Sequence, residues 1–368
     1  MRVEPDAGAL LELAAATSTY PFFPVKVLVQ LIRKLPLSIG ITRAMENTMP
    51  AKSKKKTGKQ SEPTDGGPLG WAPPDLRGKV AVVAGASRGA GRGIALALGE
   101  TGATVYVTGR TVRGGPKPSD GAPGTVEGTA EEVTARGGRG IPVAVDFSLE
   151  QQVAALFGRV EREQGRLDIL ANAVFGWSPD FFEAFLFPGR SKPRPFWERK
   201  STGWDESMMN GAYAHLLGAI HAARVMAKRR SGLIVSITEP LIGDTGGPLY
   251  WMFTAMGHQG INQIMKSISK DLVNHNIASI ALCPGFMRTE RVKMNMDLLP
   301  EKRKKSFRYD LSETPEYTGR AIASMAVDKN ILKKSGQLLY TADLAKKYKF
   351  KDADGKFVDN FYRLVRMI

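Results

Sequence analysis

The segment Lys79–Leu98, which reads KVAVVAGASRGAGRGIALAL, constrains the fold of this chain more than any other part of it. A short β-branched run, Val80–Val83, is followed by a glycine-rich turn and then by a helical pattern rich in Ala, Leu and Ile. The spacing of Gly85, Gly89 and Gly91 in the turn is G-x-x-x-G-x-G. Glycines let a backbone approach a ligand closely, and a helix N-terminus offers free N–H groups to an anion. The segment therefore predicts a strand–turn–helix unit that binds the phosphates of a dinucleotide.

Strand and helix patterns alternate from Leu76 onward, with no internal repeat. The expected strands are Val80–Ala84, Thr104–Thr108, Ile141–Val145, Ile169–Ala171, Leu233–Thr238, Ile277–Cys283 and Gly336–Tyr340. The expected helices are Gly91–Thr101, Thr125–Arg136, Leu149–Gln164, Trp204–Arg229, Met256–Asn274 and Pro315–Val327. Such alternation predicts an α/β fold, a doubly wound parallel sheet with helices on both faces. We expect a single domain over residues 75–368, preceded by an N-terminal extension over residues 1–74.

Composition narrows the classes of protein to which the chain can belong. The apolar fraction of 43% in 368 residues is ample for a large core. The one cysteine, Cys283, rules out an intramolecular disulfide and suits a reducing cytoplasmic setting. The net charge of +16 is spread along the chain without a stripe of arginines and aromatics, which argues against nucleic-acid binding. No apolar run reaches the roughly 18–20 residues of a transmembrane helix, and no metal ligands are predicted.

The N-terminal extension differs from the rest of the chain. A lysine-rich run within Ala51–Gln60 is typical of a solvated, disordered tail. Val25–Lys34 has the pattern of an amphipathic helix that docks on a partner or a membrane surface. Alternatively, translation begins at Met49, and residues 1–48 belong only to the gene model. The sequence leaves these alternatives open.

Several segments in the same order resemble the short-chain dehydrogenase/reductase family, over roughly Leu76–Gly355. The glycine loop matches that family's T-G-x-x-x-G-x-G except that Ala84 stands at the threonine position. Cys283–Thr289, which reads CPGFMRT, is similar to the Pro-Gly-x-x-x-Thr segment that lies beside the nicotinamide in the family. Segments from Ser312 to Gly355 resemble a bacterial branch related to the animal dehydrogenase/reductase member 1. The resemblance implies a Rossmann-type fold and a nicotinamide cofactor.

The residues after the second expected strand favour NADP(H) over NAD(H). An acidic residue there would bind the ribose 2′-hydroxyl of NAD, but the chain has Arg110 and no acid in reach. Arg88 lies within the glycine loop, and two guanidinium groups suit a 2′-phosphate. The cofactor-binding residues that we predict are Gly85, Ser87, Arg88, Gly89, Ala90, Gly91, Arg110, Asp146, Asn172, Ala173, Pro284, Gly285 and Thr289. The resemblance implies that Asp146 contacts the adenine; alternatively, Asp146 or Ser148 caps the helix that follows.

The tyrosine and the lysine with which the family transfers a proton are replaced in this chain. Alignment without gaps places Thr254 at the tyrosine position and His258 at the lysine position. A threonine hydroxyl is far less acidic than a phenol, whereas histidine, with an ordinary pKa of about 6.5, suits a general acid. Alternatively, His258 is a helix-surface residue or a weak ribose contact. Tyr250, one turn earlier, is expected to pack against its neighbours.

The family's serine and asparagine positions are altered as well. The expected hydroxyl falls at Thr238 or Glu239. Thr238 would hold a carbonyl oxygen, whereas Glu239 would repel the developing charge unless it is protonated or paired. The asparagine position falls at Gly211, with Asn210 one residue off, and such a slip turns a helical side chain by about 100°. The predicted catalytic residues are therefore Thr238, Thr254 and His258.

These observations predict an NADP(H)-dependent oxidoreductase that acts on a small carbonyl or alcohol substrate through an atypical proton donor. Either His258 or a water ordered by Thr254 and Thr238 would supply the proton. The alternative is a non-catalytic NADP(H)-binding sensor or partner subunit, a pseudoenzyme. An insertion rich in aromatic and basic residues, between Phe175 and Trp204, would form either a lid over an apolar, anionic substrate or a dimer surface. The resemblance also implies a homo-oligomer assembled through the two longest helices.

Overall fold

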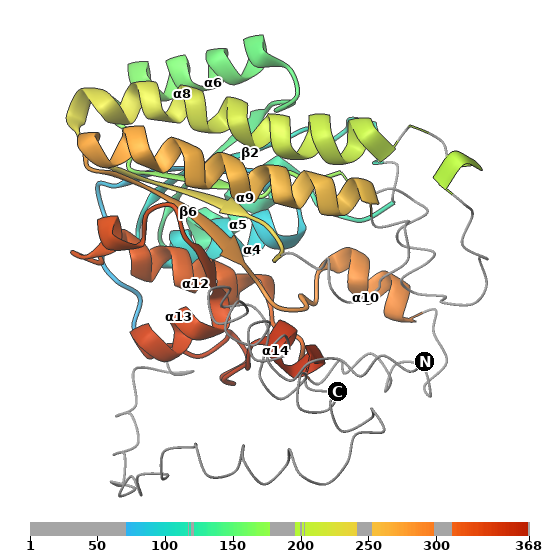
Figure 1. Cartoon of the computed structure of the whole chain (residues 1–368). Helices are drawn as coiled ribbons and strands as arrows, with labels where there is room; N and C mark the ends of the chain where they lie inside the picture. Colours follow the sequence, from blue (N-terminus) through green and yellow to red (C-terminus); the bar gives the residue numbers. More distant parts are fainter. Residues whose placement is uncertain are drawn as a thin grey trace, which may run out of the picture. The chain divides into compact units, whose positions relative to one another are not determined.

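Seven parallel strands form the centre of the structure (Figure 1). The computed structural model describes residues 71–116, 118, 121–176, 196–198, 201, 203–240, 252–297 and 311–366. The strands are β1 (Val80–Ala84), β2 (Thr104–Gly109), β3 (Arg139–Ala144), β4 (Ile169–Asn172), β5 (Gly232–Ile237), β6 (Ile277–Cys283) and β7 (Leu338–Tyr340). Their order is β3-β2-β1-β4-β5-β6-β7, so the direction of winding reverses between β1 and β4. Ligands of such sheets bind outside the carboxyl ends of the strands, near this reversal.

Helices cover both faces of the sheet, as Figure 1 shows. One layer holds α4 (Gly89–Glu100), α5 (Val126–Ala135), α12 (Pro315–Ala326) and α13 (Thr341–Tyr348). The other layer holds α6 (Glu150–Gln164), α8 (Ala214–Arg229) and α9 (Met252–Leu272). The shorter elements are η1 (Phe196–Glu198), η2 (Asp205–Tyr213), η5 (Val273–His275), α10 (Glu290–Asp297), η7 (Ile331–Lys334) and α14 (Phe361–Arg366).

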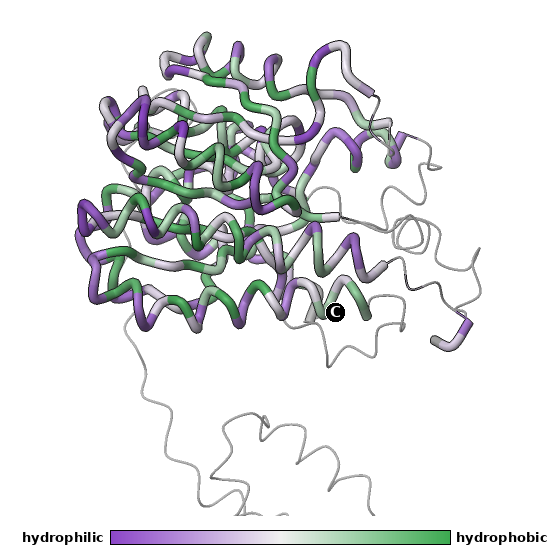
Figure 2. Tube along the Cα trace, turned by 90° about the horizontal axis from the view of Figure 1, so that it is seen from above, coloured by the Kyte–Doolittle hydropathy of each residue, from purple (hydrophilic) through white to green (hydrophobic). Residues whose placement is uncertain are grey.

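The inner strands are buried on both faces, which explains their continuous apolar runs, whereas the edge strands β3 and β7 are partly exposed. Every residue of β1 and of β6 is buried. Two hydrophobic clusters, one on each side of the sheet, form the core. Figure 2 shows hydrophobic stretches running through the interior, with hydrophilic residues on outer helix surfaces and turns. Burial on both faces is the usual state of a parallel sheet between helix layers.

The α/β fold predicted from the sequence is confirmed, including the bounds of β1 and β6. One expected helix, Trp204–Arg229, differs: its first part is the π-helix η2 and only its second part, α8, is α-helical. In the described part of the chain, no helix has both the length and the apolar character needed to cross a membrane. Residues 1–70 lie outside the described residues, so the extension and its boundary at residue 74 stay predictions.

Candidate active site

The carboxyl ends of β1, β4, β5 and β6 bring the predicted site residues to one edge of the sheet. Ala84 pairs with Asn172, and Asn172 pairs with Ser236. The N–H of Thr238 donates to the carbonyl of Leu282 on β6 (3.0 Å). The loops that follow these strands are therefore neighbours, although they are distant in the sequence.

Close backbone contacts explain the glycines of the loop after β1. A Cβ on Gly91 would lie 2.2 Å from the carbonyl oxygen of Gly85. A Cβ on Gly85, which has a φ of +73°, would lie 2.9 Å from the carbonyl oxygen of Ala173. Side chains at either position are therefore excluded, and Ala173 lies directly beside the loop. The predicted role of Ala173 in cofactor binding stays a prediction.

The first N–H group of α4 donates a hydrogen bond to a carboxylate. The Oε2 atom of Glu290 accepts a hydrogen bond from the N–H of Gly89 (2.7 Å), and its Oε1 atom lies 3.5 Å from Nη1 of Arg92. Thr289 is close as well, because its methyl carbon would lie 3.7 Å from a Cβ on Gly89. The N-terminus of α4 is thus built to hold an anion, and Glu290 is the anion that it holds in this structure. A dinucleotide phosphate fits the same place. The sequence reasoning missed Glu290, although it directly follows Thr289.

Three arginines gather next to this anion site. Arg88 donates from Nη2 to Oγ1 of Thr111 (2.8 Å) and to the carbonyl of Gly124 (3.3 Å). Burial lowers the pKa of Arg88, and the nearby charge of Arg110 lowers it further, whereas Glu290 opposes the shift.

The third arginine, Arg291, is half-buried, and its pKa falls to about 10 through burial and the charge of Arg88. The sequence reasoning missed Arg291. The guanidinium of Arg110 lies 3.7 Å from the carboxylate of Asp146. A ligand with a phosphate group would relieve the repulsion among the three cations.

Asp146 and Asn172 form hydrogen bonds that fix the chain after β3 and β4. Oδ1 of Asp146 accepts bonds from the N–H (2.9 Å) and the hydroxyl (2.6 Å) of Ser148. The N-cap position of α6 is Leu149, whose side chain makes no capping hydrogen bond, so neither Asp146 nor Ser148 has the capping role weighed from the sequence. Asn172 is buried and donates from Nδ2 to the carbonyl of Ala214 (3.4 Å), which joins β4 to α8.

The remaining predicted cofactor residues lie in or near the same loops. Ser87 is buried and Ala90 is half-buried, and both belong to the glycine loop. Pro284 is buried and Gly285 is half-buried at the end of β6. The N–H of Gly285 donates to the buried carboxyl of Glu313, whose pKa burial raises to about 8. Glu313 thus supports the Pro-Gly turn, a role that the sequence did not reveal.

An aromatic stack closes the region around the predicted catalytic residues. Oγ1 of Thr238 donates to the carbonyl of His258 (3.2 Å) and lies 3.4 Å from its Nδ1. The ring of Phe175 stacks on His258 with centroids 4.2 Å apart. A Cβ on Gly211 would lie 3.1 Å from the Phe175 ring, so the missing side chain at Gly211 leaves room for that ring. Phe175 therefore fills the space next to positions 211 and 258.

Burial changes the acid–base properties of His258. Its pKa falls to about 3, mainly through burial and also through the proximity of His215. The imidazole is therefore neutral at pH 7, and an efficient general acid has a pKa near the working pH. Thr254 lies on α9 and is buried. Thr238, Thr254 and His258 lie in one region, but their chemical role stays a prediction.

Glu239 directly follows Thr238 and lies beside His258. Its Oε2 atom is 4.0 Å from Nε2 of His258. The carbonyl of Glu239 accepts a bond from Nδ2 of Asn262 on α9 (3.0 Å), which fixes the backbone after β5. Burial raises the pKa of the Glu239 carboxyl to about 7. Tyr250 and residues 177–195 of the insertion lie outside the described residues, so the role of Tyr250 and the lid and dimer alternatives stay predictions.

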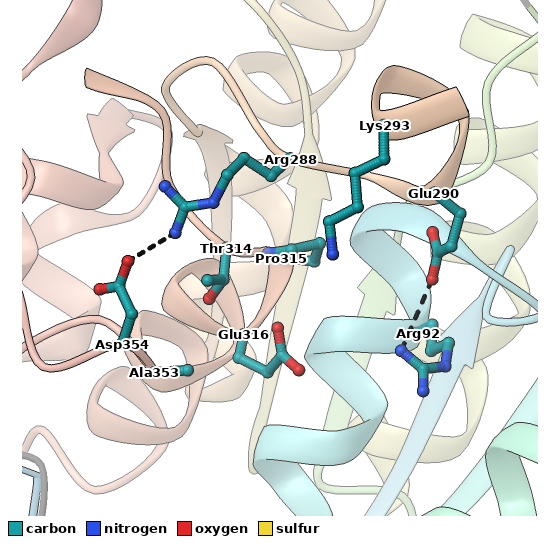
Figure 3. Close-up of a pocket in the computed structure, with 9 residues that line it drawn as sticks. All are labelled: Arg92, Arg288, Glu290, Lys293, Thr314, Pro315, Glu316, Ala353 and Asp354. Atoms are coloured by element: carbon teal, nitrogen blue, oxygen red, sulfur yellow. Dashed lines mark hydrogen bonds and ion pairs between the residues drawn. The ribbon is translucent and has the colours of Figure 1, made fainter. Parts of the chain in front are cut away.

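A charged pocket of about 280 Å³ lies beside the anion site (Figure 3). Its lining residues are Arg92, Arg288, Glu290, Lys293, Thr314, Pro315, Glu316, Ala353 and Asp354. On one side of the pocket, Arg288 forms an ion pair with Asp354 (2.7 Å). The amine of Lys293 points into the pocket. The pocket shares Glu290 and Arg92 with the N-terminus of α4, and no predicted catalytic residue lines it.

Comparisons with known proteins agree with this geometry. The family model described as short chain dehydrogenase matches residues 79–298. Dehydrogenase/reductase SDR family member 1 of Mus musculus is 36% identical over 300 residues, covering 78% of this chain and 88% of the relative. The protein of the same name from Homo sapiens is 34% identical over 298 residues, covering 78% and 88%. A solved putative dehydrogenase from Xanthomonas campestris has the same fold, with a TM-score of 0.61 at 22% identity, covering 77% of this chain and 95% of that one.

Proposed function

This chain belongs to the short-chain dehydrogenase family, and we propose that it is an NADP(H)-dependent oxidoreductase that interconverts a small carbonyl compound and its alcohol. The observation that carries this proposal is the anion site at Gly89, which holds the Glu290 carboxylate next to Arg88, Arg110 and Arg291. Once Glu290 has moved away, a dinucleotide with an additional 2′-phosphate matches both the first N–H group of the helix and the three cations. When bound, the nicotinamide group supplies or accepts the hydride.

The residues of the chain have separate tasks in this proposal. Gly89 binds a phosphate oxygen through its N–H after Glu290 has moved away. Arg88 and Arg110 select the 2′-phosphate. Thr238 and His258 form one wall of the site and orient each other through the contacts described above. Thr254 extends the same wall along α9.

The donor of the proton differs from that of the family in this proposal. Thr254 stands at the tyrosine position and lacks an acidic hydroxyl. His258 is neutral at pH 7 because its pKa is about 3, so we assign it a positioning role. The proton then comes from another group at the same edge of the sheet, or from a water ordered by Thr238 and Thr254.

We further propose a homo-oligomer that assembles through α8 and α9. Ile220 on α8 and Met256 on α9 are exposed large hydrophobic side chains, and the two helices pack side by side. Light scattering on the full chain tests this proposal, because a monomer mass would refute it. A cytoplasmic setting is also part of the proposal, since the only thiol, Cys283, is buried and free.

The direct test of the proposed function is oxidation of NADPH by the purified chain with para-nitrobenzaldehyde or diacetyl as the probe. We expect turnover with NADPH and little with NADH. A variant carrying both Thr254→Tyr and His258→Lys separates the proposal from a non-catalytic role. Loss of an existing activity in that variant supports the proposal. Activity that appears only in the variant indicates a wild-type pseudoenzyme and refutes it.

A further inference from the structure

We propose that the carboxyl group of Glu239 is the proton donor and acceptor of the reaction, in the place that Thr254 cannot fill. This inference rests on the proposed function. It begins from position: Glu239 directly follows β5, between the ends of β4 and β6, where the Pro-Gly turn of Pro284 also lies. Ligands of a doubly wound sheet bind at this edge.

Exposure separates Glu239 from the other polar side chains of this region. The Glu239 side chain is 23% exposed, while that of His258 is 7% exposed. Thr238 and Thr254 are only 1% and 4% exposed as residues. Of these four side chains, Glu239 is therefore the one that can meet both a substrate and water. A proton donor needs both contacts, because it must be reloaded after each turnover.

The surroundings of Glu239 favour the protonated acid near neutral pH. His258 faces it from α9 and is neutral at that pH. From β6 and α14, Cys283 and Tyr362 face it, and the Tyr362 hydroxyl is a hydrogen-bond partner of the Cys283 thiol. The carboxyl of Glu313 also acts electrostatically on both of these groups. Within the described residues, no lysine or arginine forms an ion pair with Glu239 that would hold it ionised. Its pKa of about 7 follows from burial without a cationic partner.

Two other candidates for the donor fit less well. His258 carries no transferable proton of suitable acidity at pH 7, because its pKa is about 3. The pKa of the Tyr362 phenol is raised well above its ordinary value by burial and by Glu239 and Cys283. A pKa near the working pH is the best for a general acid, which leaves Glu239.

The reaction balances with Glu239 in this role. During reduction, the carbonyl carbon would gain the hydride that NADPH gives up in becoming NADP⁺, and the carbonyl oxygen would take the proton from an Oε atom of Glu239. The carboxylate that remains is reprotonated by water at the exposed part of the side chain. During oxidation, the carboxylate accepts the hydroxyl proton of the alcohol as the hydride leaves its carbon.

The experiment combines a titration of Glu239 with a kinetic comparison of matched variants in the full chain. Infrared difference spectra of wild type against Glu239→Gln, without cofactor, follow the protonation of this carboxyl between pH 5 and 9. NADPH oxidation with para-nitrobenzaldehyde and diacetyl is then measured for wild type, Glu239→Gln and Glu239→Asp. Glu161→Gln is the control, because Glu161 is a surface residue that pairs with Lys228 on the adjacent helix.

We expect the Glu239 carboxyl to titrate near pH 7 and the wild-type reduction rate to fall above that pH. Glu239→Gln should lower the rate by about 10²–10⁴-fold and remove this pH dependence, with the Kd for NADPH unchanged. Glu239→Asp should recover part of the rate, and Glu161→Gln should match wild type.

If Glu239 is already ionised at pH 5, or if the Glu239→Gln variant is as active as wild type, the donor role of Glu239 is refuted, while the proposed function stands. A wild type that binds NADPH but reduces neither probe would refute the proposed function, and with it the donor role, even if Glu239 titrates near pH 7. The two failures are therefore distinguishable.

Discussion

Glu290→Gln should tighten the binding of NADPH, because the carboxylate competes with a phosphate for the N–H of Gly89. A hydrogen bond to a charged group contributes about 1.5–3 kcal/mol, and a neutral one about 0.5–1.5 kcal/mol. The carboxylate oxygen lies 2.7 Å from the Gly89 nitrogen. Exchanging this carboxylate for an amide should lower the free energy needed to move the side chain at position 290 away from the N–H by about 1–2 kcal/mol. Since 1.4 kcal/mol corresponds to a factor of ten, we expect a Kd about 5- to 30-fold lower.

Fluorescence titration with NADPH measures this change, and Glu132→Gln is the matched control. Glu132 pairs with the same Arg92 (2.5 Å) more closely than Glu290 does (3.5 Å), so its loss frees Arg92 without changing the acceptor at Gly89. We expect the control to bind NADPH as wild type does. An equal or higher Kd for Glu290→Gln would refute the idea that Glu290 occupies the phosphate position.

Three further outcomes follow from the structure. Arg110→Ala should weaken NADPH about tenfold and leave NADH unchanged, as parallel titrations would show; an equal loss for both would contradict selection of the 2′-phosphate. Gly91→Ala should abolish measurable NADPH binding and lower the Tm, because its Cβ would lie 2.2 Å from the carbonyl oxygen of Gly85. The pKa of Glu313 is raised from 4.5 to about 8, so its contribution to stability is complete below pH 4.5 and is lost as the pH rises to about 8. Urea unfolding should therefore show a smaller loss of stability between pH 5 and 8 for Glu313→Gln than for wild type.

The fold could be predicted from the sequence because its signals are local. The β-branched run of β1, the glycine turn and the apolar pattern of α4 are all contained in twenty consecutive residues, Lys79–Leu98. The π-helix η2 could not be predicted, because its apolar residues continue the pattern of α8 without a break. The close approach of Gly257 on α9 to the backbone of Ser207 in η2 is likewise a contact between elements that a local pattern does not show.

The candidate site was predicted only in part, because its electrostatics depend on contacts between distant segments. The glycine loop and Thr289 carry a recognisable spacing, whereas Glu290 meets Gly89 across 201 positions of sequence. The depressed pKa of His258 results from burial, to which the stacked Phe175 ring contributes, and no residue type reveals this in advance. Glu239 was visible in the sequence as an anomaly, but its partial exposure after β5 and its surroundings without a cationic partner become visible only in the structure.

Equilibrium titration of the purified full chain with NADPH and with NADH, followed by cofactor fluorescence, is the most direct test of cofactor binding and selection. We expect micromolar binding of NADPH and much weaker binding of NADH, because the anion site at Gly89 and the three arginines favour the dinucleotide with the additional phosphate. Absence of binding for both cofactors would contradict the proposed function while leaving the fold intact.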